Sequence, residues 1–190
     1  ILRMNGLKLQ QLIENLLSFS AWQTKSEVLT LTDFPIRALV ISVTRAQRLA
    51  LKAAHIQLKL EVDDVIVNAD REKMRTVLDN LLSNAIKFTP RGGFVTIRAR
   101  QTTQGFTIEF ADTGPGIPEE ARARVFEPFF TTKSAGTGLG LGICYGIVAE
   151  HGGTIELDPS APLGTCFRIR LPIGEDVVAS EAEEMVTPPA

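Results

Sequence analysis

One long amphipathic segment followed by two alternating segments constrains the fold of this chain more than any other feature. In residues 71–88, apolar side chains recur at the spacing of one helix face, which predicts an α-helix: Met74, Val77, Leu78, Leu81, Leu82, Ala85 and Ile86. Asp70 stands where an N-cap is expected. After the turn PRGG, residues 94–100 (FVTIRAR) and 105–111 (GFTIEFA) alternate apolar and polar side chains. This alternation predicts a β-hairpin directly after the helix.

Weaker patterns predict elements on both sides of this centre. Strands are expected at 27–34, 56–62, 65–70, 154–158 and 165–172, with helices from Pro35 to about Ala54 and from about Leu139 to Glu150. Residues 1–22 carry an apolar stripe that includes Leu9, Leu12 and Leu16. Such a helix needs a partner, either the domain that follows or a helix of a second chain. The acidic tail after Gly174 is expected to be disordered.

Composition excludes several classes of protein. The 190 residues carry a net charge of −2, so no basic footprint favours nucleic acid. No apolar run reaches the about 18 residues of a membrane span, and the first residues do not have the layout of a signal peptide. Cys144 and Cys166 form no CxxC pair and lie at no zinc-ligand spacing, so we expect buried thiols in a reducing compartment.

A glycine-rich run, GTGLGLG at residues 136–142, has glycines at four alternate positions. Glycine has no side chain, so the backbone of this run can approach a ligand closely, and phosphate is the usual ligand of such a run. In a Walker A loop the lysine follows the glycines, whereas Lys133 precedes them here. A dinucleotide fingerprint would follow a strand directly, and FEPFFTTK is not strand-like. The remaining prediction is a loop that ends at a helix N-terminus, where free N–H groups bind anions; a plain surface turn is the alternative.

Two further segments carry residues suited to binding a ligand. Asp112, in DTGPGIP, follows an apolar strand and can accept a hydrogen bond from an exocyclic amine such as that of adenine, while Gly114 and Gly116 admit a flat ring. Aspartic proteases also use Asp-Thr-Gly, but they need two such carboxylates in one site, and this chain has only one such segment.

On the helix of residues 71–88, the segment DNLLSNAIKF places Asn80, Asn84 and Lys87 on one narrow face. Asn84 offers an oxygen ligand for Mg²⁺, and Lys87 a charge for phosphate. Turn chemistry and a solvated helix face are the simpler alternatives.

Taken in order, these segments resemble the motifs of one family. DNLLSNAIKFTP resembles the N box of sensor histidine kinases of two-component systems, DTGPGIP the first glycine box, FEPFF the F box, and GTGLGLGI the second glycine box. GTCFRIRLP resembles the final glycine-threonine strand, and residues 1–22 resemble the second helix of the dimerisation and phosphoacceptor hairpin. The resemblance implies a two-layer α/β sandwich of the histidine-kinase/gyrase ATPase type (the Bergerat fold), preceded by one amphipathic helix.

The resemblance also implies a division of the chain and a site. Residues 1–24 would end the hairpin, residues 25–174 would form the catalytic ATP-binding domain, and residues 175–190 would be an acidic tail. Asp112 would bind the adenine amino group with the support of Thr165. Asn84 would hold Mg²⁺, and Asn80, Asn84, Lys87 and Lys133 would be catalytic. Phe126 and Phe129 would anchor a lid of about residues 126–142. The implied ATP site comprises Asn80, Asn84, Lys87, Asp112, Gly114, Gly116, Ile117, Phe126, Phe129, Thr132, Lys133, Gly136, Thr137, Gly138, Leu139, Gly140, Leu141 and Thr165.

The expected reaction is transfer of the ATP γ-phosphoryl group to a histidine, with ATP and Mg²⁺ as cofactors. Hydrolytic relatives carry a glutamate one helical turn before the Mg²⁺ asparagine, where this chain has Asn80, which cannot act as a base. Neither His55 nor His151 fits the phosphoacceptor pattern, so the acceptor is expected outside these residues. A stand-alone ATPase, a non-enzymatic nucleotide-binding regulator and a serine kinase remain alternatives.

The implied partners are the phosphoacceptor hairpin of the same or a partner subunit and a response regulator receiver domain. The parent protein would be a homodimer and would not bind nucleic acid. This domain is expected in the cytoplasm, and the parent protein is either free or anchored in a membrane.

Overall fold

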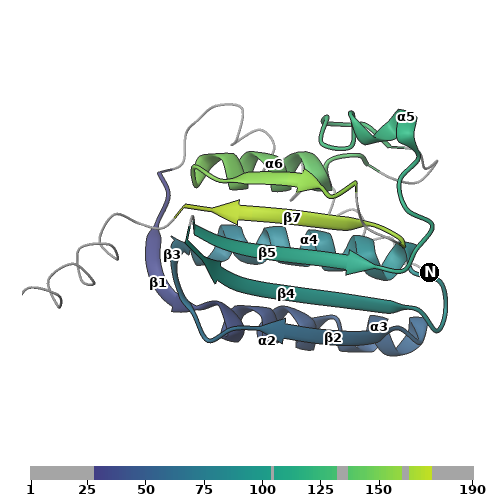
Figure 1. The fold of residues 1–190 in the computed structure, drawn as a ribbon, viewed down its shortest axis with the longest axis horizontal. Helices are drawn as coiled ribbons and strands as arrows, with labels where there is room; N and C mark the ends of the chain where they lie inside the picture. The colour runs from purple at the N-terminus through teal and green to yellow at the C-terminus, as the bar shows by residue number, and fades with distance from the viewer. Residues whose placement is uncertain (1–27, 104, 132–136, 160–162, 173–190) are drawn as a thin grey trace, which may run out of the picture.

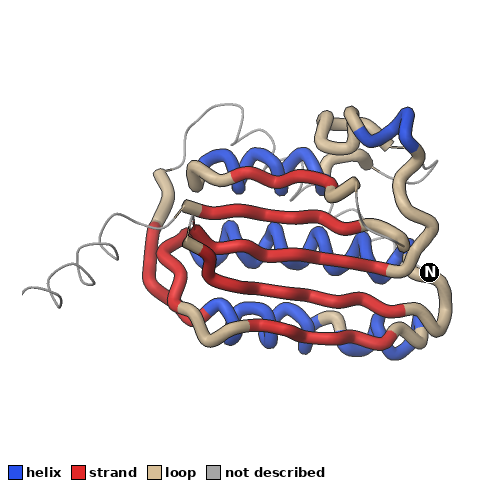
Figure 2. The backbone as a smooth tube through the Cα atoms, in the orientation of Figure 1, coloured by secondary structure: helices blue, strands red, loops and turns tan. Residues whose placement is uncertain are grey.

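A single mixed sheet with helices on one face forms the body of the molecule. The computed structural model describes residues 28–103, 105–131, 137–159 and 163–172. Figure 1 shows the sheet in front and the helices behind it, and Figure 2 shows the same division into two layers. This is the two-layer α/β sandwich that the motifs implied. The predicted helix at 1–22 and the predicted acidic tail lie outside the described residues.

The sheet has the strand order β2-β4-β5-β7-β6. Only the β2–β4 pair is parallel, and each other neighbouring pair is antiparallel. The predicted hairpin is confirmed as β4 and β5, which pair in antiparallel register from Val95↔Asp112 to Thr102↔Gly105. The strands are β2 (Gln57–Val62), β4 (Phe94–Thr102), β5 (Gly105–Asp112), β6 (Thr154–Leu157) and β7 (Cys166–Leu171). A separate two-stranded sheet joins β1 (Leu31–Pro35) to β3 (Ile66–Asp70).

The longest of the described helices, α4 (Arg71–Phe88), has the predicted bounds, and the Asp70 carboxylate caps it by accepting the Lys73 N–H at 3.1 Å. One prediction was wrong: the helix expected from Pro35 to Ala54 is two helices, α2 (Ile36–Ala46) and α3 (Arg48–Ala54), and Pro35 precedes the first. The break is at Gln47 (ψ 3°), whose side chain bonds to Asp79. The sequence has neither Gly nor Pro there, so periodicity could not reveal it. The last helix, α6 (Gly140–Glu150), agrees with expectation, and the short α5 (Glu119–Arg122) was not foreseen.

The core lies between the sheet and the helices. All the residues predicted to form the apolar face of α4 are buried except Ile86, which is partly exposed and packs against the core. The described cysteines are free and buried, as expected, and burial raises the pKa of Cys144 to about 12 and that of Cys166 to about 11. None of the described helices combines the length and apolarity that a bilayer span requires.

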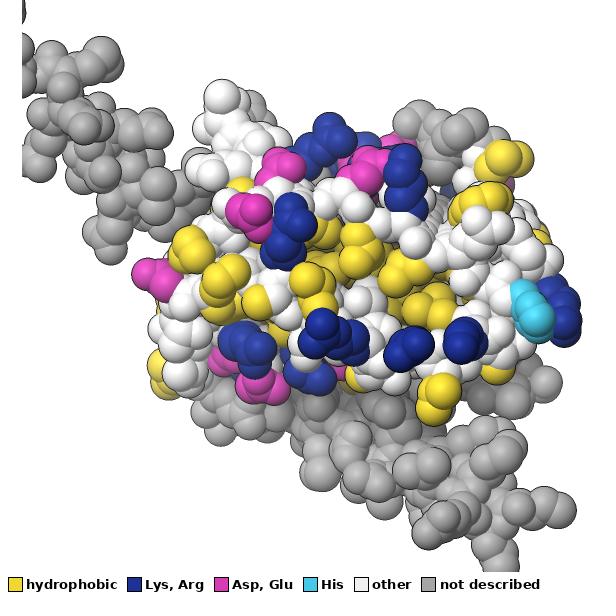
Figure 3. Space-filling model, turned by 90° about the horizontal axis from the view of Figure 1, so that it is seen from below, with side chains coloured by type: hydrophobic (Ala, Val, Ile, Leu, Met, Phe, Trp, Pro, Cys, Tyr) yellow, Lys and Arg dark blue, Asp and Glu magenta, His cyan; other side chains and the backbone are white. Residues whose placement is uncertain are grey.

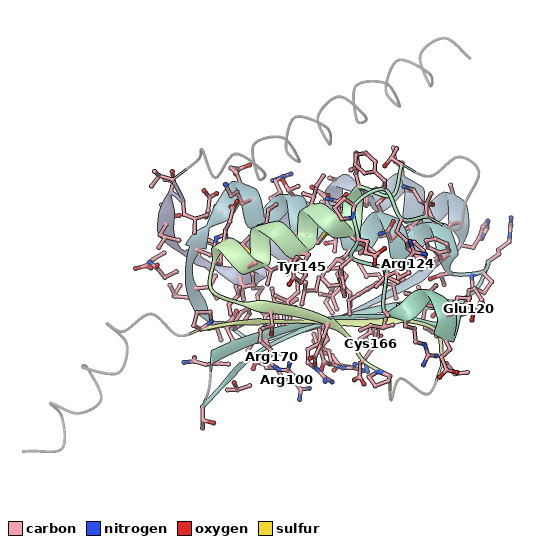
Figure 4. All side chains as sticks on the ribbon, turned by 90° about the horizontal axis from the view of Figure 1, so that it is seen from above. Arg100, Glu120, Arg124, Tyr145, Cys166 and Arg170 are labelled. Atoms are coloured by element: carbon pink, nitrogen blue, oxygen red, sulfur yellow. The ribbon has the colours of Figure 1, made fainter. Side chains whose placement is uncertain are left out.

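The outer face of the sheet carries a row of alternating charges. Five residues in direct cross-strand register run from β2 to β6 in the order Glu61, Arg98, Glu109, Arg168 and Glu156. Neighbouring side chains in this row are 2.8–3.6 Å apart. The side chains that Figure 4 labels Arg100 and Arg170 project from this same face, away from the helices. Opposite charges directly across from each other favour one register, and the polar row assigns this face to solvent.

Charged side chains border β2, one of the two edge strands of the sheet. Between α2 and β2 lies a groove of about 320 Å³, lined in part by Arg37, Ile41, Leu60 and Arg100. Figure 3 shows apolar side chains gathered on this side of the molecule between rows of Lys and Arg. Arg37 pairs with Asp64 and Arg100 with Glu61, and charged side chains beside a strand edge discourage unwanted pairing with other chains.

The central strand β5 provides the first prediction. Ile108 is fully buried, so Ile108→Ala leaves a cavity and is expected to lower the free energy of unfolding by about 2–5 kcal/mol. Ile66 is 61% exposed, so the matched change Ile66→Ala is expected to stay within about 0.5 kcal/mol. Urea unfolding measures both. Equal losses in the two variants would contradict the assignment of the core.

Candidate functional site

A cleft of about 820 Å³ lies between α4, the loop that follows β5, the start of α6 and the end of the sheet. The helices α4 and α6 lie side by side behind the sheet in Figure 1, and α5 lies beyond one end of them. The three motifs singled out in the sequence meet at this cleft. Helix α4 contributes Asn80, β5 contributes Asp112, and the glycine run contributes Gly138.

Asp112 is the buried charge of the site. Along β5 the side chains of Phe106, Ile108, Phe110 and Asp112 are buried, with partly exposed residues between them. Because strand side chains alternate between faces, Asp112 continues the row that points toward the helices. The sheet pattern therefore places a carboxylate, 8% exposed, at the end of an apolar row.

Three donors hold this carboxylate. The Gly114 N–H donates to Oδ1 at 2.7 Å, and the N–H and hydroxyl of Thr165 also donate to the side chain. Burial raises the pKa of Asp112, and the bonds from Gly114 and Thr165 lower it in part. The net shift is upward, so the ionised form is costly to keep here. A carboxylate in this state gains from any further donor that a ligand offers.

Glycines let the backbone close around Asp112. Gly164 has φ +70°, and a Cβ there would overlap the Asp112 carbonyl oxygen. A Cβ on Gly114 would stand 2.7 Å from Asp112 Oδ1 and 2.9 Å from the Phe88 carbonyl oxygen. The close approach at Gly114 is therefore to the protein's own carboxylate, whereas Gly116 lines the cleft.

Helix α4 forms the polar wall. Asn80, Asn84 and Lys87 all line the cleft, as their shared face predicted. Among the described residues, no other group hydrogen-bonds to the two asparagine amides, so their oxygens are open to a ligand. The first residue of α6 faces this wall: a Cβ on Gly140 would come within 3.2 Å of Asn80 Oδ1. The described part of the chain contains no cluster of three or more His, Cys, Asp and Glu that could hold a metal. A metal here would depend on amide oxygens such as that of Asn84.

Asp79 also lines the cleft, which the helical angle between it and Asn80 did not suggest. Its carboxylate lies 3.8 Å from Arg75 and accepts from the Gln47 side chain. Burial raises the pKa of Asp79, with Arg75 acting in the opposite direction. Its partners hold the carboxylate toward α2 and α3, at the break between them.

The F-box phenylalanines have different positions. Phe126 packs against the core, with ring centroids 5.9 Å from Tyr145 and 6.0 Å from Phe167. Phe129, expected as a second anchor, is 59% exposed with φ 66° and does not line the cleft. Phe130 lines it instead, with the Arg124 guanidinium 4.6 Å from its ring centroid. Figure 4 labels Arg124 and Tyr145 on the side of the sheet that carries the helices.

Most of the expected site residues meet at this cleft. Eleven line it: Asn80, Asn84, Lys87, Asp112, Gly116, Ile117, Thr137, Gly138, Gly140, Leu141 and Thr165. Four do not: Gly114, Phe126, Phe129 and Leu139, the last of which is buried. Thr132, Lys133 and Gly136 lie outside the described residues.

Sequence reasoning missed several residues that line the cleft. Thr76 lies one turn before Asn80 on the same face of α4, so helical spacing could have indicated it. Phe110 and Phe167 are buried and lie side by side on neighbouring strands. Their position follows from strand pairing, which the sequence alone did not reveal.

Known proteins of one family are similar to this chain. Residues 69–175 match the family described as histidine kinase-, DNA gyrase B-, and HSP90-like ATPase. The adaptive-response sensory kinase SasA of Rippkaea orientalis is 46% identical over 112 residues, which cover 56% of this chain and 29% of that protein. The chain thus spans less than a third of this relative.

Solved structures are similar over more of the chain. The catalytic domain of histidine kinase ThkA is 35% identical with a TM-score of 0.70, over 75% of this chain and 95% of that domain. ThkA has also been solved in complex with the response regulator TrrA. Full-length ShkA in complex with AMPPNP is 30% identical with a TM-score of 0.80, over 91% of this chain and 37% of that one.

The buried carboxylate gives a prediction about stability. Because the pKa of Asp112 is raised, the folded state binds this proton more tightly than the unfolded state. The free energy of unfolding therefore falls as pH rises through the raised pKa. Asp112→Asn removes the charge and keeps an oxygen acceptor for Gly114. We expect this variant to be at least as stable as the wild type at pH 7, with a flatter pH profile above pH 4.

Urea unfolding from pH 4 to pH 8 tests this expectation, with the exposed Asp63→Asn as the matched control. A loss of more than about 1 kcal/mol at pH 7 in Asp112→Asn alone would mean that the hydrogen bonds to Asp112 outweigh its burial.

Proposed function

This chain belongs to the histidine kinase-, DNA gyrase B-, and HSP90-like ATPases, as a catalytic domain of the histidine kinase type, and from that premise we propose that it transfers the γ-phosphoryl group of ATP to a histidine outside these 190 residues. The observation that carries the proposal is the buried Asp112 carboxylate at one end of a cleft whose other wall bears Asn80, Asn84 and Lys87. The Asp112 end of the cleft suits a nucleobase with an exocyclic amine, and the α4 wall suits phosphates with a hard cation.

The adenine subsite is built around Asp112. Burial raises the pKa of Asp112, and a hydrogen bond from the adenine amino group would add a further donor that stabilises the ionised form. Thr165 supports the carboxylate, while Gly116 and Ile117 leave room for a flat ring. Guanine presents a carbonyl oxygen at the corresponding position, which would face Asp112 without a proton. The pocket therefore selects adenine by a hydrogen bond and not by size alone.

The α4 wall fits the charged part of ATP. The Asn84 amide oxygen is a suitable ligand for Mg²⁺, which prefers oxygen donors and phosphate. Asn80 assists beside Gly140, and Lys87 neutralises phosphate charge. Bound Mg²⁺ supplies charge neutralisation for the transfer. Lys133 and the lid of residues 126–142 keep their predicted roles at the terminal phosphates, although part of that segment lies outside the described residues.

In this reaction the bond from the γ-phosphorus to its bridging oxygen breaks, a bond to an imidazole nitrogen forms, and ADP leaves. Catalysis of this kind depends on positioning and charge stabilisation. Asn80 cannot serve as a base for water, and Asp79 is held by Arg75 and Gln47. This arrangement favours a protein acceptor over water. A stand-alone ATPase is the second candidate, because Asp79 does line the cleft.

We further infer that the acceptor histidine is on a hairpin to which residues 1–24 belong, that residues 25–174 are the catalytic unit, and that residues 175–190 are a tail. The next acceptor is a response regulator, by analogy with the complex that ThkA forms with TrrA. The parent protein is proposed to be a homodimer, with this domain in the cytoplasm, where ATP is available.

Nucleotide binding gives a direct prediction. Loss of the charged acceptor in Asp112→Asn is expected to weaken ATP binding about tenfold to a hundredfold, the effect of one charge-assisted hydrogen bond. Isothermal titration calorimetry with ATP and Mg²⁺ measures the change, with Asp63→Asn as the control that should bind normally. Unchanged affinity for ATP in Asp112→Asn would mean that adenine does not bind at Asp112.

Phosphoryl transfer is followed with γ-labelled ATP. The chain is incubated alone and with a separately supplied phosphoacceptor hairpin. We expect label on the hairpin only, stable to base and labile to acid, as for phosphohistidine. Release of free phosphate by the chain alone, abolished by Asn84→Ala, would make it an ATPase. Label on serine would point to a serine kinase, and failure to bind ATP would point to a regulator without catalysis.

A further inference from the structure

His151, which the proposed site does not use, follows the last residue of α6, at the opposite end of this helix from Gly140. Its Nδ1 lies 2.7 Å from the Ile147 carbonyl oxygen, one turn earlier in the same helix. Its Nε2 lies 2.9 Å from the backbone nitrogen of Asp70, at the junction of β3 and α4. The Asp70 carboxylate in turn accepts the Thr30 N–H, next to β1, at 3.1 Å.

These partners fix the protonation state of the ring. A carbonyl oxygen only accepts, so Nδ1 carries the proton that binds Ile147. A backbone N–H only donates, so Nε2 must offer its lone pair to Asp70. The ring is therefore neutral in this geometry. A proton on Nε2 would point the ring N–H at the Asp70 backbone N–H. Two donors cannot form a hydrogen bond, so the link to Asp70 would be lost.

The link fixes α6 relative to α4, the two helices that form opposite walls of the cleft. At the cleft, Gly140 of α6 packs against Asn80 of α4. At the far end, His151 binds Asp70, and Glu150 pairs with Lys73 at 2.9 Å. Figure 1 shows that α6 runs toward the side of the molecule where β1 and β3 lie. These contacts at the two ends of α6 add to the buried packing of its middle in the core.

We propose that neutral His151 is a positioning residue for the nucleotide site, and that its protonation breaks the hydrogen bond from the end of α6 to Asp70 and weakens nucleotide binding. The test compares nucleotide binding at pH 7.5 and pH 5.5, within the range over which histidine side chains as a class change charge. This inference rests on the proposed function, because it takes the cleft to be the nucleotide site.

The charged groups around His151 are few. From β3 and α4 they are Asp70 and Lys73, and from α6 Glu150. On β7, the Arg170 backbone approaches Gly153, while the Arg170 guanidinium pairs with Glu156 at 2.8 Å. The Lys73–Glu150 pair joins the same two helix ends and does not depend on His151, so protonation of the ring removes one of two contacts between them.

The test uses the two histidines of the chain. The affinity for a non-hydrolysable ATP analogue with Mg²⁺ is measured at pH 7.5 and pH 5.5 for the wild type, His151→Gln and His55→Gln. Gln can accept from Asp70 but does not titrate. The analogue's own protonation affects all three proteins equally, so the ratio of the two affinities is compared. We expect this ratio to be about five- to tenfold larger in the wild type and His55→Gln than in His151→Gln.

Equal ratios in all three proteins would overturn the proposal. The NMR signal of the Asp70 amide gives a second readout that needs no nucleotide. It should move with pH in the wild type and stay constant in His151→Gln, and constancy in both would also overturn the link. If no protein binds the analogue at pH 7.5 while the Asp70 signal titrates as expected, the proposed function fails and the His151 link stands.

Discussion

The rest of the site depends on one carboxylate that is kept out of water. Asp112 ends the inward row of the central strand, so the alternation that builds the core also buries its charge. Burial raises the pKa of Asp112, and Gly114 and Thr165 hold the side chain in place. A Cβ on Gly164 would displace this arrangement, since it would overlap the Asp112 backbone. The glycine-threonine pair that precedes β7 is thus required by Asp112, although more than fifty residues separate them.

The two faces of the sheet have different roles. The inner face supports α4 and α6 and ends in Asp112, while the outer face carries the alternating row from Glu61 to Glu156. The acidic ends of this row have lowered pKa values: Lys59 and then Arg98 bind Glu61, and Arg170 binds Glu156. A shift of one strand by a single residue would bring these charges inward and Asp112 outward. The same register therefore fixes both faces.

The sequence predicted the elements better than their contacts. The α4 bounds and the Asp70 cap followed from periodicity and capping chemistry, and the β4–β5 hairpin from alternation. The break at Gln47 did not, because a side-chain bond to Asp79 accompanies it in place of a helix breaker. Asn80, Asn84 and Lys87 were predicted together because one helix face carries them. The exposure of Phe129 and the use of Phe130 were not, because a positive φ at Phe129 turns the chain. Long-range contacts such as His151 with Asp70 have no local signal.

The most direct test is a crystal structure of this domain with an ATP analogue and Mg²⁺. We expect the adenine amino nitrogen within about 3.2 Å of the Asp112 carboxylate, with the phosphates toward Asn84 and Lys87. Adenine bound elsewhere in the cleft, with Asp112 contacted only by Gly114 and Thr165, would contradict the central claim that this buried carboxylate is the adenine anchor.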